Sequence, residues 1–227
     1  MLSEQIGALC SDFYVNQRMS LKLDLPTARE TVLDMFDRVR RDLPGMDRFR
    51  RYDDELALES AEEDSRYSWL ALGRTAIRSG WVNPEVLEDA YGLHRLIIEL
   101  APYFLSISPL DMDSRELMFG VDLEAERNRN EVVFDALFGD SPLRAIVADE
   151  EPLVDAQPFV GFALDPGCAR QAFVEVKTRT RTHEIAAGRF DAEPISIYLT
   201  VRTYGPFRTI EDLAEAFAQL SRDGERL

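Results

Sequence analysis

Apolar and polar side chains alternate with a period of two over residues 18–25. The apolar positions are Met19, Leu21, Leu23 and Leu25. This period is expected for a strand with one buried face. The pattern then changes, because Thr27 with Glu30 three positions later forms a capping box, and apolar residues at helical spacing continue as far as Leu43. We therefore expect a strand followed by a helix, which the Pro-Gly pair at 44–45 ends.

The remainder of the first half repeats these two periods. Extended segments are predicted at 55–60 and 67–77, and a helix that Asn83 caps and Pro84 opens follows. Extended residues come next, at 104–108 and then 116–123, and are counted as one strand. The predicted order is strand, helix, strand, strand, helix, strand. That order is the ferredoxin-like βαββαβ unit, in which two helices cover one face of an antiparallel sheet.

The second half also contains predicted helices and strands, but its sequence does not repeat that of the first half. The predicted elements are a helix at 130–138 that Gly139 ends, strands at 159–164, 172–182 and 195–203, and a last helix that Thr209 caps. The expected fold class is α+β, with antiparallel sheets and helices packed on one face. We divide the chain into a ferredoxin-like unit at 1–125 and a second α+β portion at 126–227, either separate or continuous with the first as one domain.

Composition and charge narrow the classes of function. A hydrophobic fraction of 45% in 227 residues is normal for a globular protein, and the net charge of −16 repels nucleic acid and anionic membranes. The same acidity is expected to keep the protein soluble or to offer an acidic face to a basic protein partner. No apolar run has membrane-spanning length, the start of the chain does not resemble a signal peptide, and Cys10 and Cys168 lie far apart. We expect a cytoplasmic protein with no membrane contact.

The sequence contains few groups typical of catalysis. It has no GxSxG, GxGxxG or GxxxxGK[ST] motif, so neither a nucleophile elbow nor a nucleotide loop is supported. His94 falls on the apolar stripe of a predicted helix and is expected in the core. The acidic run at 111–116 lacks the glycine and glutamate of a calcium loop and is interpreted as a hairpin tip. No cofactor and no metal site are predicted.

One segment, residues 176–183, is basic in an otherwise acidic chain. On a continuous strand, Lys177, Arg179, Arg181 and His183 would share one face. Tyr198 and Arg202 would join them if the strand at 195–203 pairs alongside. One interpretation is a solvated face on which arginines pair with surplus carboxylates. The other is a surface that binds an anion or a partner, since guanidinium groups bind carboxylates and phosphates in a bidentate manner.

Two hypotheses of function follow from these patterns. The first is a non-catalytic binding or protein-interaction module that associates with itself, or with another protein, through an exposed sheet face or edge. The alternative is an enzyme or ligand-binding protein for a small anionic molecule, held in a pocket that the basic segment lines. Nucleic acid is disfavoured as a partner by the charge.

Overall fold

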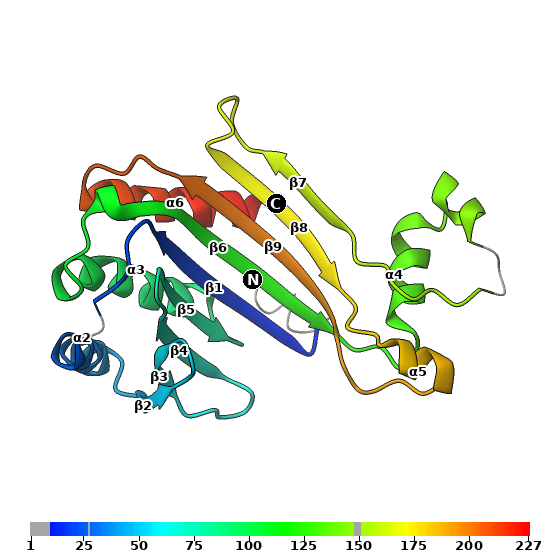
Figure 1. Cartoon of the computed structure of the whole chain (residues 1–227), viewed down its shortest axis with the longest axis horizontal. Coiled ribbons are helices and arrows are strands. Elements are labelled where there is room, and N and C mark those ends of the chain that lie inside the picture. The colour runs from blue at the N-terminus through cyan, green and yellow to red at the C-terminus, as the bar shows by residue number, and fades with distance from the viewer. Residues whose placement is uncertain (1–9, 27, 148–150) are drawn as a thin grey trace.

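A computed structural model describes residues 10–26, 28–147 and 151–227. Its strands are β1 (Asp12–Leu21), β2 (Met46–Arg51), β3 (Leu56–Ser60), β4 (Tyr67–Leu72), β5 (Ala76–Val82), β6 (Met112–Leu123), β7 (Phe159–Ala163), β8 (Arg170–Lys177) and β9 (Ile195–Tyr204). Over these residues they form one antiparallel nine-stranded sheet, in the order β2-β3-β4-β5-β1-β6-β9-β8-β7 (Figure 1). The α+β class is confirmed. The pairing of β6 with β9 joins the two halves of the chain in a single sheet.

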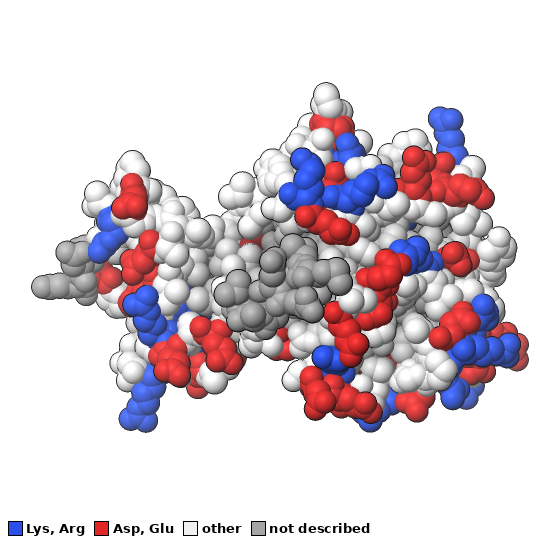
Figure 2. Space-filling view, turned by 180° about the vertical axis from the view of Figure 1, so that it is seen from behind, with Lys and Arg blue, Asp and Glu red and all other residues white. Residues whose placement is uncertain are grey.

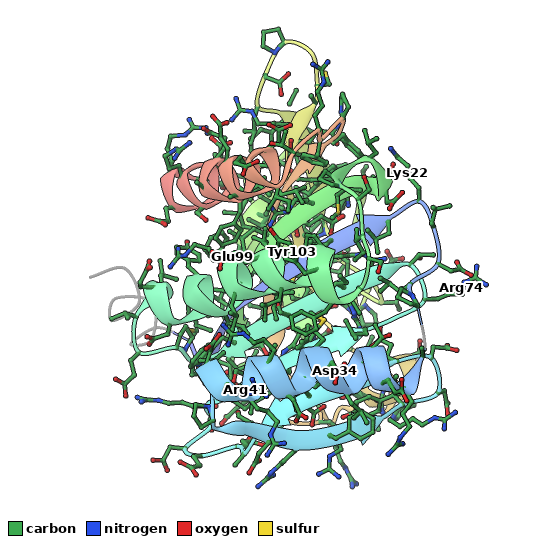
Figure 3. The ribbon with its side chains drawn as sticks, turned by 90° about the vertical axis from the view of Figure 1, so that its left-hand side faces the viewer. Lys22, Asp34, Arg41, Arg74, Glu99 and Tyr103 are labelled. Carbon is green, nitrogen blue, oxygen red and sulfur yellow. The ribbon has the colours of Figure 1, made fainter. Side chains whose placement is uncertain are left out.

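Three helices form a layer on one face of this sheet. The helices of the structure are α2 (Arg29–Asp42), α3 (Leu87–Phe104), α4 (Arg129–Phe138), α5 (Thr182–Ala187) and α6 (Ile210–Arg226). Helices α2, α3 and α6 lie side by side, with exposed residues such as Asp34 of α2 and Tyr103 of α3 labelled in Figure 3. Helices α4 and α5 lie apart from that layer, at one end of the long strands (Figure 1). Acidic and basic side chains are interspersed over the helix-bearing side (Figure 2).

The main core lies between this helix layer and the sheet. Alternate residues of β1, including Val15 and Met19, are fully buried against it. Helix α2 buries the stripe that its sequence pattern predicts, and α6 buries Leu213 and Phe217 over β6 and β9. These three elements, β1, α2 and α6, are therefore amphipathic, each with the period of its own backbone. Within the described residues, no helix is both long and apolar enough to cross a membrane.

The predicted ferredoxin-like order is not confirmed, because the first half contains more strands than the pattern indicated. The segment predicted as one strand at 67–77 is two strands, β4 and β5, joined by a hairpin in which Gly73 N–H donates to Ala76 O at 2.9 Å. A further strand, β2, follows α2. Apolar residues lie on both sides of the hairpin turn, so the sequence pattern predicted a single continuous strand. The observed order is β-α-β-β-β-β-α-β.

Several predicted boundaries in the first half are wrong. Asn83 does not cap α3: it has a φ of 49°, and its side-chain oxygen accepts from Phe13 N–H at 2.8 Å, while the helix begins at Leu87. Residues 104–105 end α3 rather than start an extended segment. The acidic run at 111–116 is not a hairpin tip, because residues 112–116 lie within β6. The predicted cap Thr27 lies outside the described residues.

In the second half, the two predicted helices lie where the sequence indicated, one strand is shorter, and one helix, α5, was not predicted. Helix α4 matches the predicted range, and Thr209 caps α6 by accepting from Asp212 N–H at 3.1 Å. Strand β8 stops at Lys177 instead of continuing to 182. The chain then turns, with Arg179 in the left-handed region at a φ of 52°, and enters α5. The period-two alternation predicted for the strand at 172–182 therefore ends at this turn.

Candidate binding surfaces on the sheet

The face of the sheet opposite the helix layer is open, and Figure 1 looks onto it. Aromatic rings on this face cover glycines of the neighbouring strands. A Cβ added to Gly80 would lie 2.5 Å from the Trp69 ring, one at Gly161 would lie 2.8 Å from Phe173, and one at Gly120 would overlap Tyr14. The rings therefore lie close to the backbone, which is an arrangement that stabilises glycine in strands. The result is a row of aromatic surface across the open face.

A hydrogen-bonded network spans β1, β6 and β9 on the same face. Tyr14 OH donates to Asp122 Oδ1 at 3.2 Å, and Ser196 Oγ donates to the same oxygen. Arg179 donates to Ser196 Oγ at 2.5 Å and to Tyr198 OH at 2.8 Å. Burial raises the pKa of Tyr14 far above its usual value, and the neighbouring Tyr198 and Asp122 raise it further. The Tyr14 phenol is thus a permanent hydrogen-bond donor.

Two other predicted site residues, Lys177 and Arg202, lie on the open face with partners. Lys177 Nζ is 3.3 Å from Glu175, beside it on β8. Arg202 Nε is 2.7 Å from Glu116, and its guanidinium lies 4.9 Å from the centroid of the Phe173 ring. Both cations are engaged by groups of the chain itself. This pairing agrees with the interpretation of a face on which basic residues bind carboxylates.

Arg181 and His183 do not join this group. The turn at Arg179 carries the chain into α5, where Arg181 is the N-terminal capping residue and His183 is exposed. Arg181 Nη2 is 3.4 Å from Glu193. The structure therefore brings Lys177, Arg179, Tyr198 and Arg202 to one face and separates Arg181 and His183 from them.

A buried ion pair that sequence patterns did not indicate holds α4 to α5. Arg129 is fully buried and donates to Glu184 at 3.1 Å, to Thr178 O at 2.7 Å and to Asp191 O at 2.7 Å. Hydrogen bonds from the backbone N–H groups of Arg181 and Asp191, with that guanidinium, lower the pKa of Glu184 to about 2. Arg129 and Glu184 are 55 positions apart, so no local pattern could have indicated the pair.

A second buried polar network lies under the helix layer. His94 Nδ1 is 2.8 Å from Ser79 Oγ, Gln17 Nε2 donates to Ser79 Oγ at 3.3 Å, and Arg115 donates to Gln17 Oε1 at 2.7 Å and to Leu213 O. Burial lowers the pKa of His94 to about 3 and that of Arg115 to about 9. The prediction that His94 is a core residue is confirmed. The serine–histidine pair is closed to any substrate, and the network is structural.

Strand β7 forms one edge of the sheet and is exposed along its whole length. Phe159, Val160 and Phe162 are 61%, 58% and 41% exposed, and Val174 on the adjacent strand is 36% exposed. The ring of Phe159 stacks on Phe173, with centroids 5.6 Å apart. Apolar side chains exposed on both faces of an edge strand are a mark of an association site.

The hydrogen-bond pattern of β7 leaves one side of its backbone unpaired within the sheet. Leu164 N–H donates to Arg170 O at 2.9 Å, and Val176 N–H donates to Pro158 O at 3.0 Å. Even-numbered residues of this segment therefore bond to β8, because hydrogen-bonded pairs recur every second residue in an antiparallel ladder. The N–H and C=O groups that point away from the sheet are those of Phe159, Gly161 and Ala163.

A comparison of the sequence with models of known protein families and with curated proteins finds no match.

Proposed function

We propose that this chain is a non-catalytic interaction module that associates with a second copy of itself through the outer edge of β7. The supporting observation is that edge, which combines outward-pointing backbone groups with exposed Phe159, Val160 and Phe162. Edge strands in native proteins usually carry charge, proline or a covering segment that prevents pairing. Residues 159–163 have neither charge nor proline.

The sequence of β7 is complementary to itself in an antiparallel pair. A two-fold axis at Gly161 places Phe159 opposite Ala163 of the second copy, and Val160 opposite Phe162 of the second copy. On each face a large residue then meets a smaller one, so the rings of the two copies do not collide. Every outward N–H and C=O finds a partner, and each apolar cross-strand pair adds roughly 0.2–1 kcal/mol.

The charge distribution also permits pairing at this edge. Two chains of net charge −16 repel one another, but screening limits that repulsion to about 10 Å at ordinary salt. Strand β7 is uncharged, and the neighbouring β8 carries Arg170 and Lys177 with a single acidic residue, Glu175. Association at this edge therefore brings together strands that carry no charge of their own.

Light scattering coupled to size-exclusion chromatography tests the proposal. At micromolar concentration, light scattering should give the unmodified chain twice the mass of one chain. The double variant Val160→Lys, Phe162→Lys should be a monomer, because lysines on both copies repel each other and oppose pairing. Ile146→Lys is the matched control: Ile146 is 75% exposed but lies away from the sheet, so this variant should remain dimeric. A monomeric unmodified chain, or a dimer that survives both lysines, would refute the proposal.

A further inference from the structure

A pocket of about 550 Å³ opens on the other half of the open face, where β1, β4 and β6 contribute its walls. Three aromatic side chains line it: Tyr14, Tyr67 and Trp69. The volume falls within the range of small-molecule and side-chain pockets, roughly 300–1,000 Å³. Strands β9 and β8 separate the pocket from β7, so the inference below holds whether or not the chain associates with itself.

The charged groups of the pocket all have the same sign. Asp12 on β1 is directly opposite Asp122 on β6, and Glu62 also lines the pocket. Carboxylates directly opposite each other on paired strands are destabilising. Among the described residues, no lysine or arginine lines the pocket, and none forms an ion pair with these three carboxylates. Within the described part of the chain, the pocket therefore has a negative charge that no lysine or arginine neutralises by an ion pair.

Hydrogen bonds hold the carboxylates in position. Asn83 Nδ2 donates to Asp12 Oδ1 at 2.7 Å, and the Tyr14 hydroxyl donates to Asp122 at 3.2 Å. The side-chain oxygen of Asn16, which also lines the pocket, is buried and has no donor within the described part of the chain. Together these groups offer several acceptors in fixed places. A matching ligand must bring a positive charge and several N–H donors.

The geometry selects an organic cation over a metal ion. Within 10–26, 28–147 and 151–227, no three His, Cys, Asp or Glu side chains converge closely enough to hold a metal. A guanidinium group is planar, has five donors and no acceptor, and stacks on aromatic rings. The chain already shows this contact beside the pocket, where the Arg78 guanidinium lies 5.8 Å from the centroid of Trp69. We infer that this pocket binds a guanidinium group on an alkyl stem, either a free small molecule or an arginine side chain.

Calorimetric titration with three probes tests the chemistry of the ligand. N-acetyl-arginine-N-methylamide should bind, and the citrulline analogue, which has the same shape without the charge, should bind at least tenfold more weakly. Butylguanidinium distinguishes a free small molecule from an arginine side chain as the ligand. If it binds with the same affinity as the arginine probe, the pocket recognises the guanidinium alone. If it binds fivefold more weakly, the pocket recognises an arginine within a polypeptide. Equal binding of the citrulline probe, or no binding of any probe, would overturn the inference.

Nuclear magnetic resonance locates the site, because the chain has two tryptophans on opposite faces of the sheet. The indole N–H signal of Trp69, assigned with Trp69→Phe, should shift on addition of the arginine probe. The signal of Trp81 should not shift, since Trp81 pairs with Val15 and faces the helix layer. A shift confined to Trp81 would contradict the assignment.

Charge variants test the residues. Asp122→Asn should weaken binding of the arginine probe about tenfold, because it removes one of two opposed charges while keeping an acceptor for Tyr14. Glu124→Gln, two positions away and outside the pocket, removes the same charge and should change affinity less than twofold. Tyr67→Leu removes an exposed aromatic wall of the pocket and should also weaken binding of the arginine probe. If both Asp122→Asn and Tyr67→Leu bind the arginine probe as tightly as the unmodified chain, the pocket is not the binding site.

Discussion

Acidification from pH 7 to pH 5 is expected to destabilise the fold through His94. Its side chain is completely buried, and burial lowers the pKa to about 3, compared with about 6.5 for an imidazole in water. The nearby Arg115 guanidinium lowers it further. His94 Nδ1 lies 2.8 Å from the Ser79 hydroxyl, in a hydrogen bond whose donor depends on the tautomer of the ring.

The sign and size of the effect follow from proton linkage. The folded state binds the proton more weakly than the unfolded state, so stability is complete above pH 6.5 and declines as the pH falls from there toward 3. Each pH unit of acidification in this window lowers the free energy of unfolding by about 1.4 kcal/mol. At pH 5 the loss attributed to His94 is therefore about 2 kcal/mol, which is a large fraction of the stability of an ordinary domain.

Urea unfolding at pH 7 and pH 5, at one fixed protein concentration, measures this loss. The decrease in the free energy of unfolding should be about 2 kcal/mol smaller in His94→Gln than in the unmodified chain, since glutamine does not titrate. His183→Gln is the control, because His183 is exposed on α5, and its decrease should match that of the unmodified chain. Equal decreases in His94→Gln and the unmodified chain would refute the reasoning.

Three further substitutions test packing and pairing, each by the free energy of unfolding in urea. Glu184→Gln leaves the buried Arg129 without its counter-ion and should cost about 3 kcal/mol; a loss below 1 kcal/mol would contradict the structural role of the pair. Gly120→Ala should destabilise the sheet, because the added Cβ overlaps the Tyr14 ring. Gly92→Ala meets no atom within 4 Å in the middle of α3 and should instead stabilise by roughly 0.8–1 kcal/mol. Opposite signs for the two glycine variants are the expected result.

Much of the secondary structure was predictable because local patterns carry it. The alternation predicted over 18–25 overlaps β1 only at 18–21, because β1 begins at Asp12 and ends at Leu21, whereas the apolar stripes of α2 and α6 match the sides that pack on the sheet. Thr209 begins α6 as its capping box predicts. These signals depend only on neighbours in the sequence, where a side chain's burial follows from the repeat of the backbone.

The candidate sites were predictable only in part. Lys177, Tyr198 and Arg202 reach the open face because their strands pair as expected, with Lys177 opposite Ser196. The prediction that residues 177, 179, 181 and 183 share one face of a strand was wrong. Arg179 has a positive φ, so the strand ends before it and Arg181 points elsewhere. A local propensity cannot foresee such a turn when the tertiary contacts of the turn stabilise it, here the hydrogen bonds of Arg179 to β9.

By itself, the sequence determined that the chain is an acidic α+β protein and where most helices and several strands lie. Only the tertiary structure decided which strands become neighbours. It inserted β1 between β5 and β6, and so placed Asp12 opposite Asp122 beside the aromatic rings of the pocket. It also left β7 at an uncovered edge. Such features arise from contacts between residues far apart in the chain, and these contacts depend on which apolar faces can be buried together and not on any local repeat.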